Sequence, residues 1–239
     1  MTTTHQYPHP VICIDGPSGA GKGTLAYRLA DELGFSLLDS GALYRIIGLL
    51  AHKANLLSDA TPDLENQLEK LTQSLNLAFV INHETKMVEI LVNGEPLVDD
   101  IRNETVGGYA SKVAVFPKVR TALFDVQRDM AKRGGLIADG RDMGTVIFPD
   151  APVKVFLTAS AKARADRRVS QLTQAGKAAD YEAILAEIVA RDERDQNRSV
   201  APSKPADDAL VLDSSELNAE QVYEKVRAFC QSKGVNLPN

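Results

Sequence analysis

Cysteine is scarce in this sequence, and long apolar segments are missing. The 239 residues include only two cysteines, Cys13 and Cys230, which are too few for a disulfide framework. Free thiols fit a reducing compartment, so we expect a cytoplasmic protein. No window approaches 18 consecutive apolar residues, and we expect no contact with a membrane. The first residues, MTTTHQYPHP, lack the charged-then-apolar order of a secretory signal, and residues 1–10 are expected to form a disordered tail.

Positive charge is not in excess either. The chain has 27 Lys and Arg residues against 32 Asp and Glu residues, which gives a net charge of −5. Broad nucleic-acid binding needs a basic face, so no nucleic-acid partner is expected. The motif N-K-x-D, which would indicate a guanine-reading switch protein, does not occur. The basic residues must therefore be judged by where they cluster.

Short apolar segments alternate with helical segments through most of the chain. The expected strands are residues 11–15, 35–39, 135–139, 153–159 and 209–213. The expected helices are residues 24–33, 42–54, 104–115, 117–133 and 218–230. This alternation is typical of an α/β fold, in which a five-stranded parallel sheet is covered by helices on both faces.

The middle of the chain follows another pattern. Apolar and polar residues alternate with a period of two in LNLAFVIN (75–82) and in MVEILVNGEPLV (87–98), including Val88, and Asn93-Gly94 is a hairpin turn signal. We expect residues 63–105 to be a small antiparallel subdomain inserted into the parallel core. The core would then comprise residues 11–62 and 106–233, followed by a tail at 234–239.

The segment GPSGAGKGT directly follows the first strand. It fits the phosphate-binding P-loop pattern G-x-x-x-x-G-K-[ST], except that Gly23 stands between Lys22 and Thr24. A glycine-rich turn lets successive N–H groups point at phosphate oxygens, and the helix N-terminus and Lys22 add positive charge. We expect this loop to bind the phosphates of ATP through Gly16, Pro17, Ser18, Gly19, Ala20, Gly21, Lys22, Gly23 and Thr24.

Two residues near this loop are candidates for holding Mg²⁺. Thr24 can offer its hydroxyl to the metal shell, and Asp139 ends an apolar strand where an acidic residue can hold the ion. The alternative for Asp139 is that it only caps the turn that follows the strand.

Arginines gather in two later segments. On a helix at 100° per residue, Arg191, Asp195 and Arg198 share one face, whereas Asp192 and Glu193 point elsewhere. Arg164, Arg167 and Arg168 form a second stripe, and residues 160–200 are expected to form a helical lid that bears arginines. Guanidinium groups neutralise developing charge on phosphoryl oxygens. The alternatives are an Arg–Asp–Arg stripe that satisfies itself and an exposed basic helix face.

Several segments in this order resemble the bacterial cytidylate kinases, a family of nucleoside monophosphate kinases. They are IDGPSGAGKGT, LLDSGALYR, ASKVAVFPKVR, LIADGRDMGTVIFPDAPVKVFL and RDERDQNRSVAP, and the resemblance covers about residues 11–233. It implies a P-loop NTPase core with an inserted nucleoside-monophosphate-binding subdomain and a lid. It also implies phosphoryl transfer from ATP to CMP or dCMP with Mg²⁺, by a monomer.

The resemblance also implies roles for individual residues. The phosphate of the acceptor would meet Arg45, Arg141 and Arg198, its sugar would meet Ser40, Arg191 and Asp195, and its base would meet Ser111, Arg120 and Asp142. The catalytic residues would be Lys22, Arg141, Arg191 and Arg198, and the lid residues Arg164, Arg167 and Arg168 would add to ATP binding. A carboxylate at Asp142 suits the N4 amine of cytosine and would reject uracil, which has an acceptor at that position.

Three other functions remain open at the level of sequence. A kinase for another nucleoside monophosphate or a small-molecule kinase similar to shikimate kinase would use the same loop. A nucleotide-dependent switch would hydrolyse ATP steadily without an acceptor, which the kinase interpretation does not predict.

Overall fold

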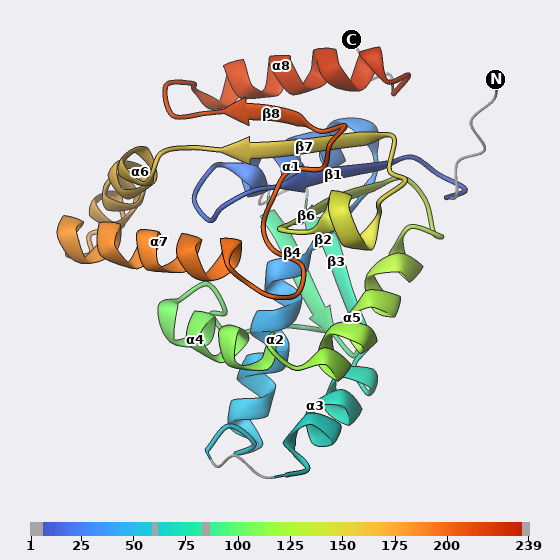
Figure 1. The fold of residues 1–239 in the computed structure, drawn as a ribbon, viewed down its shortest axis with the longest axis vertical. Helices are drawn as coiled ribbons and strands as arrows, with labels where there is room; N and C mark the ends of the chain where they lie inside the picture. Colours follow the sequence, from blue (N-terminus) through green and yellow to red (C-terminus); the bar gives the residue numbers. More distant parts are fainter. Residues whose placement is uncertain (1–6, 59–61, 83–86, 236–239) are drawn as a thin grey trace.

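A parallel sheet of five strands forms the centre of the molecule (Figure 1). The computed structural model describes residues 7–58, 62–82 and 87–235. The strands lie in the order β2-β6-β1-β7-β8. Their bounds are β1 Val11–Asp15, β2 Ser36–Asp39, β6 Leu136–Gly140, β7 Val153–Thr158 and β8 Leu210–Asp213. The predicted α/β fold with five parallel strands is confirmed, and each strand lies within one residue of its expected bounds.

Helices cover both faces of this sheet because its strands are apolar on both sides. In β1, Ile12 and Ile14 join the core beneath α1 (Lys22–Leu33) and α8 (Ala219–Ser232). Val11 and Cys13 join the core on the other face, beneath α2 (Ser40–Lys53) and α5 (Pro117–Met130). Both cysteines are buried free thiols.

The inserted segment forms a separate antiparallel sheet, as predicted. It contains β3 (Leu77–Asn82), β4 (Met87–Val92) and β5 (Glu95–Pro96). Asn93 and Gly94 have φ of 54° and 87°, which a two-residue hairpin turn requires. Phe79 is buried and Val80 is exposed, as the period-two alternation predicts, whereas the expectation for the Val88 side chain lies outside the described residues. The helix that precedes this sheet, α3 (Leu64–Gln73), was not predicted.

Two helices beyond β7 form the lid. They are α6 (Ala161–Gln174) and α7 (Tyr181–Gln196), and they pack side by side at the carboxyl end of the sheet (Figure 1). Below α7 in this view lies α4 (Glu104–Val113), which packs on α2. A short π-helix, η1 (Met143–Ile147), follows β6 and was not predicted.

The structure differs from the expected tail of residues 1–10 at its last four residues. Tyr7 is 8% exposed and its ring packs edge-on against Phe148 at 5.5 Å, while the carbonyl of Pro10 accepts a hydrogen bond from the N–H of Leu136. An aromatic ring next to an apolar sheet edge gains more from burial than from solvent. At the other end of the chain, Val235 is also buried. Residues 1–6 and 236–239 of the two expected tails lie outside the described residues.

Candidate active site

Most of the predicted site residues lie at the carboxyl edge of the parallel sheet. The glycine turn follows β1, Ser40 follows β2, Arg141 and Asp142 follow β6, and the lid follows β7. Parallel strands all end at the same edge, so segments that are far apart in sequence converge there. The remaining members come from α2, α4 and α5, which approach this edge from one side (Figure 1).

The turn between β1 and α1 needs glycine. Gly16, Gly19 and Gly21 have φ of 139°, 80° and 96°, and a Cβ added to Gly16 would lie 1.9 Å from the carbonyl oxygen of Leu157. The turn therefore lies directly against β7. Because α1 begins at Lys22, its first N–H groups face the turn and favour an anion there.

Lys22 is buried at the start of α1, with 7% of its side chain exposed. Its Nζ donates to the carbonyl of Pro17 at 3.0 Å and lies 3.7 Å from Oδ1 of Asp139. Burial lowers the pKa of Lys22 and the charge of Arg141 lowers it further, whereas Asp139 and Asp39 oppose both effects. The ammonium group is thus held between the turn and the carboxyl end of β6.

Asp139 and Asp39 lie side by side, because they are register partners in β6 and β2. Burial raises the pKa of Asp139, Lys22 opposes the rise, and the negative charge of Asp39 adds to it. The Asp139 carboxylate faces the start of α1, since a Cβ on Gly23 would lie 3.9 Å from its Oδ2. The hydroxyl-bearing Thr24 is exposed one residue further along α1.

This carboxylate pair fits a magnesium ion. Among the described residues, no three His, Cys, Asp or Glu side chains gather closely enough to hold a metal by themselves. Mg²⁺ does not require such a cage, because it keeps several waters and binds through one or two carboxylates plus substrate phosphates. Asp139 beside the glycine turn meets that requirement, and Asp39 is a candidate that the sequence did not single out.

A second cluster joins the segment after β6 to the lid, and it contains residues predicted to contact the acceptor. Nε of Arg141 donates to Oδ2 of Asp195 at 2.9 Å, and Nε of Arg198 donates to the Asp195 carbonyl at 3.4 Å. Burial by itself would raise the pKa of Asp195, but the charges of Arg141, Arg198 and Arg191 outweigh it and lower the pKa. One correction concerns Arg198: α7 ends at Gln196, so Arg198 lies beyond the helix and is not placed by a helical period.

Arg198 also carries a buried nitrogen that needs an acceptor. Its Nη2 has no hydrogen-bond partner in the described part of the chain. A buried donor that stays unpaired costs free energy, and for a charged group the cost is larger. An anion bound beside Asp195 and Arg141 would satisfy it.

The predicted base-reading residues are only partly brought together. Nη2 of Arg120 donates to Oδ2 of Asp142 at 2.8 Å, with at most 14% of either side chain exposed. The Tyr44 ring lies 5.9 Å from this guanidinium, and burial is the main cause that raises the Tyr44 pKa to about 12. Ser111, in contrast, is exposed on α4 and donates to the Gly107 carbonyl of its own helix at 3.1 Å.

Two further acceptor-side residues lie on α2. Ser40 opens this helix and is 5% exposed. Nη1 of Arg45 donates to the carbonyls of Ile101 and Asn103 at 2.7 and 2.8 Å. Arg45 thus connects α2 to the segment that precedes α4.

The three arginines of α6 have different surroundings. Arg164 is 3% exposed and lies against Gly19; it donates to the carbonyls of Ala159 and Ser18 at 3.0 and 3.1 Å and pairs with both oxygens of Asp192 on α7. Arg167 donates to Ser214 before α8, and Arg168 is half-buried. Only Arg164 of this group contacts the glycine turn.

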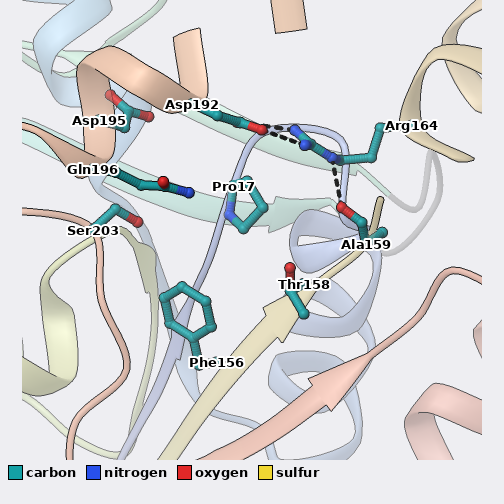
Figure 2. A pocket seen from close by; sticks show the side chains of 9 residues that line it. All are labelled: Pro17, Phe156, Thr158, Ala159, Arg164, Asp192, Asp195, Gln196 and Ser203. Carbon is teal, nitrogen blue, oxygen red and sulfur yellow. Dashed lines mark hydrogen bonds and ion pairs between the residues drawn. The ribbon is translucent and has the colours of Figure 1, made fainter. Parts of the chain in front are cut away.

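A cavity of about 180 Å³ lies beside this contact (Figure 2). In Figure 2, Asp192 and Arg164 face each other across the glycine turn at Pro17, and Asp195 and Gln196 lie further along α7. Phe156 and Thr158 of β7 form its floor, and Ser203 lies at its edge. The glycine turn and the lid helices both line the cavity, and the Arg120–Asp142 pair is not part of its lining.

Three acidic residues of this region were not predicted as site residues. Asp39 and Asp15 are the last residues of β2 and β1, and Asp192 is the lid partner of Arg164. A carboxylate at the carboxyl end of a parallel strand is a signal that the sequence already contained. The pairing of Asp192 with Arg164 depends on how two helices meet, and residue spacing within one helix does not reveal it.

The sequence is also similar to known proteins over most of its length. The family described as Cytidylate kinase matches residues 12–232. A protein from Actinobacillus succinogenes named cytidylate kinase is 53% identical over 226 residues, which cover 93% of this chain and 99% of that protein. Proteins of the same name from Pasteurella multocida and Klebsiella pneumoniae are 53% and 51% identical, covering 92% and 94% of this chain and 95% and 96% of their own lengths.

Within the described residues, no helix has both the length and the apolar character that crossing a membrane requires.

Proposed function

The chain belongs to the cytidylate kinase family and is an ATP-dependent nucleoside monophosphate kinase, and from this premise we propose that it transfers the γ-phosphoryl group of ATP to CMP or dCMP. The products are ADP and CDP or dCDP. The arrangement that best supports this proposal is the cluster of Arg141 and Arg198 on Asp195, which lines the same cavity as Pro17 of the glycine turn, with a buried Arg198 nitrogen that needs an acceptor.

The donor phosphates bind to the backbone of residues 16–24 and to Lys22. Lys22 moves from the Pro17 carbonyl to the β- and γ-phosphates, and Arg141, Arg191 and Arg198 neutralise the oxygens of the transferred group and of the acceptor phosphate. Arg45 contributes a further positive charge to the acceptor phosphate. Arg164, Arg167 and Arg168 contact ATP from the lid. A phosphate monoester is already ionised near neutral pH, so the reaction needs no general base.

Thr24 and Asp139 would hold magnesium, and Asp39, the register partner of Asp139, would contribute through water. Bound there with ATP, Mg²⁺ would supply positive charge to the β- and γ-phosphates. The chain's own part is to keep the two carboxylates beside the glycine turn.

Asp142 and Arg120 read the base, and Ser111 joins them once its hydroxyl leaves the Gly107 carbonyl of α4. The carboxylate of Asp142 accepts a hydrogen bond from the N4 amine of cytosine, and its ion pair with Arg120 holds it in one orientation. Uracil presents an oxygen at that position and would leave two acceptors facing each other, which discriminates against UMP. Ser40, Arg191 and Asp195 contact the sugar.

We also propose that the enzyme works as a monomer and that it works in the cytoplasm. The two buried free cysteines suit the reducing conditions of that compartment. Size-exclusion chromatography with light scattering tests the oligomeric state at assay concentrations.

A coupled assay of ADP formation with ATP, Mg²⁺ and each monophosphate in turn tests the reaction. We expect CMP or dCMP to give the highest kcat/KM, UMP and AMP to be weaker by ~10²-fold or more, and ATP hydrolysis without an acceptor to be slow. Preference for UMP or AMP would contradict the role of Asp142. Steady hydrolysis without any acceptor would instead favour a nucleotide-dependent switch, and turnover only of a non-nucleotide alcohol would favour a small-molecule kinase.

A further inference from the structure

Asp15 connects the donor loop to the turn that carries Arg141 and Asp142. It is the last residue of β1, directly before Gly16, and is 5% exposed. Its Oδ1 accepts the N–H of Met143 at 2.8 Å and its Oδ2 accepts the N–H of Gly144 at 2.8 Å. Both hydrogen bonds are buried, and they join β1 to the residues that directly follow Asp142.

These two N–H groups belong to the first turn of η1, whose opening N–H groups have no partner within the helix. The carbonyl of Asp142 in turn accepts the N–H groups of Val146 and Ile147 at 2.9 and 3.1 Å. The turn after Asp142 is therefore held at its start by the Asp15 carboxylate and at its end by hydrogen bonds to the Asp142 carbonyl.

The same turn is confined on its other sides. A Cβ added to Gly144 would lie 3.1 Å from Cγ of Lys154 and 3.4 Å from Oδ2 of Asp15. Lys154 is itself held by both oxygens of Asp208 at 2.9 Å. A shift of the backbone at residues 143–144 thus has little room unless Asp15 releases it.

We propose that Asp15 is a positioning residue for recognition of the acceptor base. By fixing the backbone of residues 143–144 it sets the direction in which the Asp142 carboxylate and the Arg141 guanidinium face the acceptor. This inference rests on the proposed function, because it assigns to Asp15 the support of the residues that read CMP. Asp15 contacts no substrate in this scheme and acts through Asp142.

The chemistry requires a carboxylate at this position. Two N–H donors face the side chain, and a carboxylate offers an acceptor oxygen to each, whereas an amide of the same shape offers one oxygen and turns an NH₂ group toward the other donor. Burial raises the pKa of Asp15 to about 7 even though its two backbone hydrogen bonds lower it. An ionised carboxylate in this place lowers stability, so stability alone does not account for it.

The substitution Asp15→Asn keeps the volume and removes one acceptor. We expect the KM for CMP to rise ~10-fold and the preference for CMP over UMP in kcat/KM to fall by a similar factor, because the turn after Asp142 loses one of the two hydrogen bonds that fix it. The KM for ATP should change by less than ~2-fold, since the glycine turn keeps its own contacts with β7. The matched control is Asp207→Asn, which removes an exposed carboxylate that takes no part in confining this turn and should leave both KM values unchanged.

If Asp15 had a purely structural role, Asp15→Asn would lower the Tm and the active fraction but leave the KM values and the base preference unchanged. This result would overturn the proposal. An equal rise in the KM for ATP and for CMP would overturn it as well. If Asp15→Asn does not fold, Gly144→Ala is the second variant. Its Cβ would lie 3.1 Å from Cγ of Lys154 and 3.4 Å from Oδ2 of Asp15, so it crowds the same contact and should raise the KM for CMP selectively.

Failure of the proposed function would look different. If the wild-type enzyme prefers another monophosphate, the cytosine assignment fails, and the effect of Asp15→Asn is then read on the KM for that acceptor. If the wild type prefers CMP and the variant discriminates as well as the wild type, the role of Asp15 fails and the reaction assignment stands.

Discussion

Three arginines of the candidate site are held by carboxylates of the chain itself. The pairs are Arg120–Asp142, Arg141–Asp195 and Arg164–Asp192. An unpaired charge at such half-buried positions would cost free energy, so each guanidinium keeps a partner and a fixed direction. Substrate binding then has to share or replace these partners, which makes geometry as important as charge.

Lys22 is the residue whose removal should act on the chemical step. We expect Lys22→Ala to lower kcat by ~10²-fold or more, because an ammonium group that contacts the transferred phosphoryl group stabilises charge that develops in the transition state. The measurement is steady-state kinetics with CMP, with circular dichroism as a check on folding. Lys162→Ala is the matched control, since Lys162 is an exposed lysine that pairs with Asp166 on α6 and should leave kcat unchanged. A kcat near the wild-type value in Lys22→Ala would contradict the assignment.

At the scale of elements, the lid is attached to the core mainly by polar contacts. No side chain of α7 is buried, and α6 buries only Arg164 and Ala165. An element with so few buried apolar contacts belongs to the least stable parts of a fold and can move separately from the sheet. The pair Arg164–Asp192 joins the two lid helices, and the contacts of Arg164 with Ser18 and Ala159 join them to the glycine turn.

Loss of that pair should loosen the lid while the sheet stays intact. We expect Asp192→Asn to increase hydrogen–deuterium exchange in residues 181–196 by ~10-fold or more, because Arg164 would remain buried without its charged partner. Exchange in the strands of the parallel sheet should not change. Glu193→Gln, an exposed neighbour on the same helix, is the control and should exchange as the wild type does. Uniformly faster exchange over the whole chain would show that the pair stabilises the fold as a unit.

The elements that sequence predicts well are those with a long periodic signal. Continuous apolar runs located the parallel strands, and period-two alternation with Asn93-Gly94 located the inserted hairpin. The π-helix η1 was not predicted, because its hydrogen bonds depend on Asp15 from a strand that is distant in sequence. The site residues follow the same rule. Residue spacing placed Asp195 near arginines, whereas the pairing of Arg164 with Asp192 depends on how α6 packs on α7 and could not be predicted.

At the scale of the whole molecule, one strand serves both halves of the site. The carboxyl end of β1 leads into the glycine turn, and its last side chain, Asp15, holds the turn after β6. Because β1 is the central strand and is buried on both faces, it belongs to the most stable part of the fold. In the proposed function, the donor loop and the acceptor residues are thus both attached to this strand.

The burial of Asp15 predicts a pH dependence of stability for the whole fold. Its pKa rises from an ordinary 3.8 to about 7 in the folded protein, mainly through burial, so between these values the folded state keeps a proton that the unfolded state releases. The stability that Asp15 contributes is complete below about pH 4 and is lost as the pH rises through about 7, by up to about 1.4 kcal/mol for each pH unit. This direction is opposite to that of a carboxylate stabilised by an ion pair.

Urea unfolding of the wild type and of Asp15→Asn between pH 5 and pH 8 tests this. We expect the unfolding free energy of the wild type, minus that of the variant, to decrease steadily as the pH rises and to level off above about pH 7, because other titrating groups cancel in the difference. The same comparison with Asp207→Asn, an exposed carboxylate outside this turn, is the control for effects of the substitution itself. A difference for Asp15→Asn that is flat from pH 5 to pH 8 would mean that Asp15 is already ionised in the folded protein at pH 5. The two amide hydrogen bonds would then outweigh burial, and the carboxylate would stabilise the turn after β6 over the whole range.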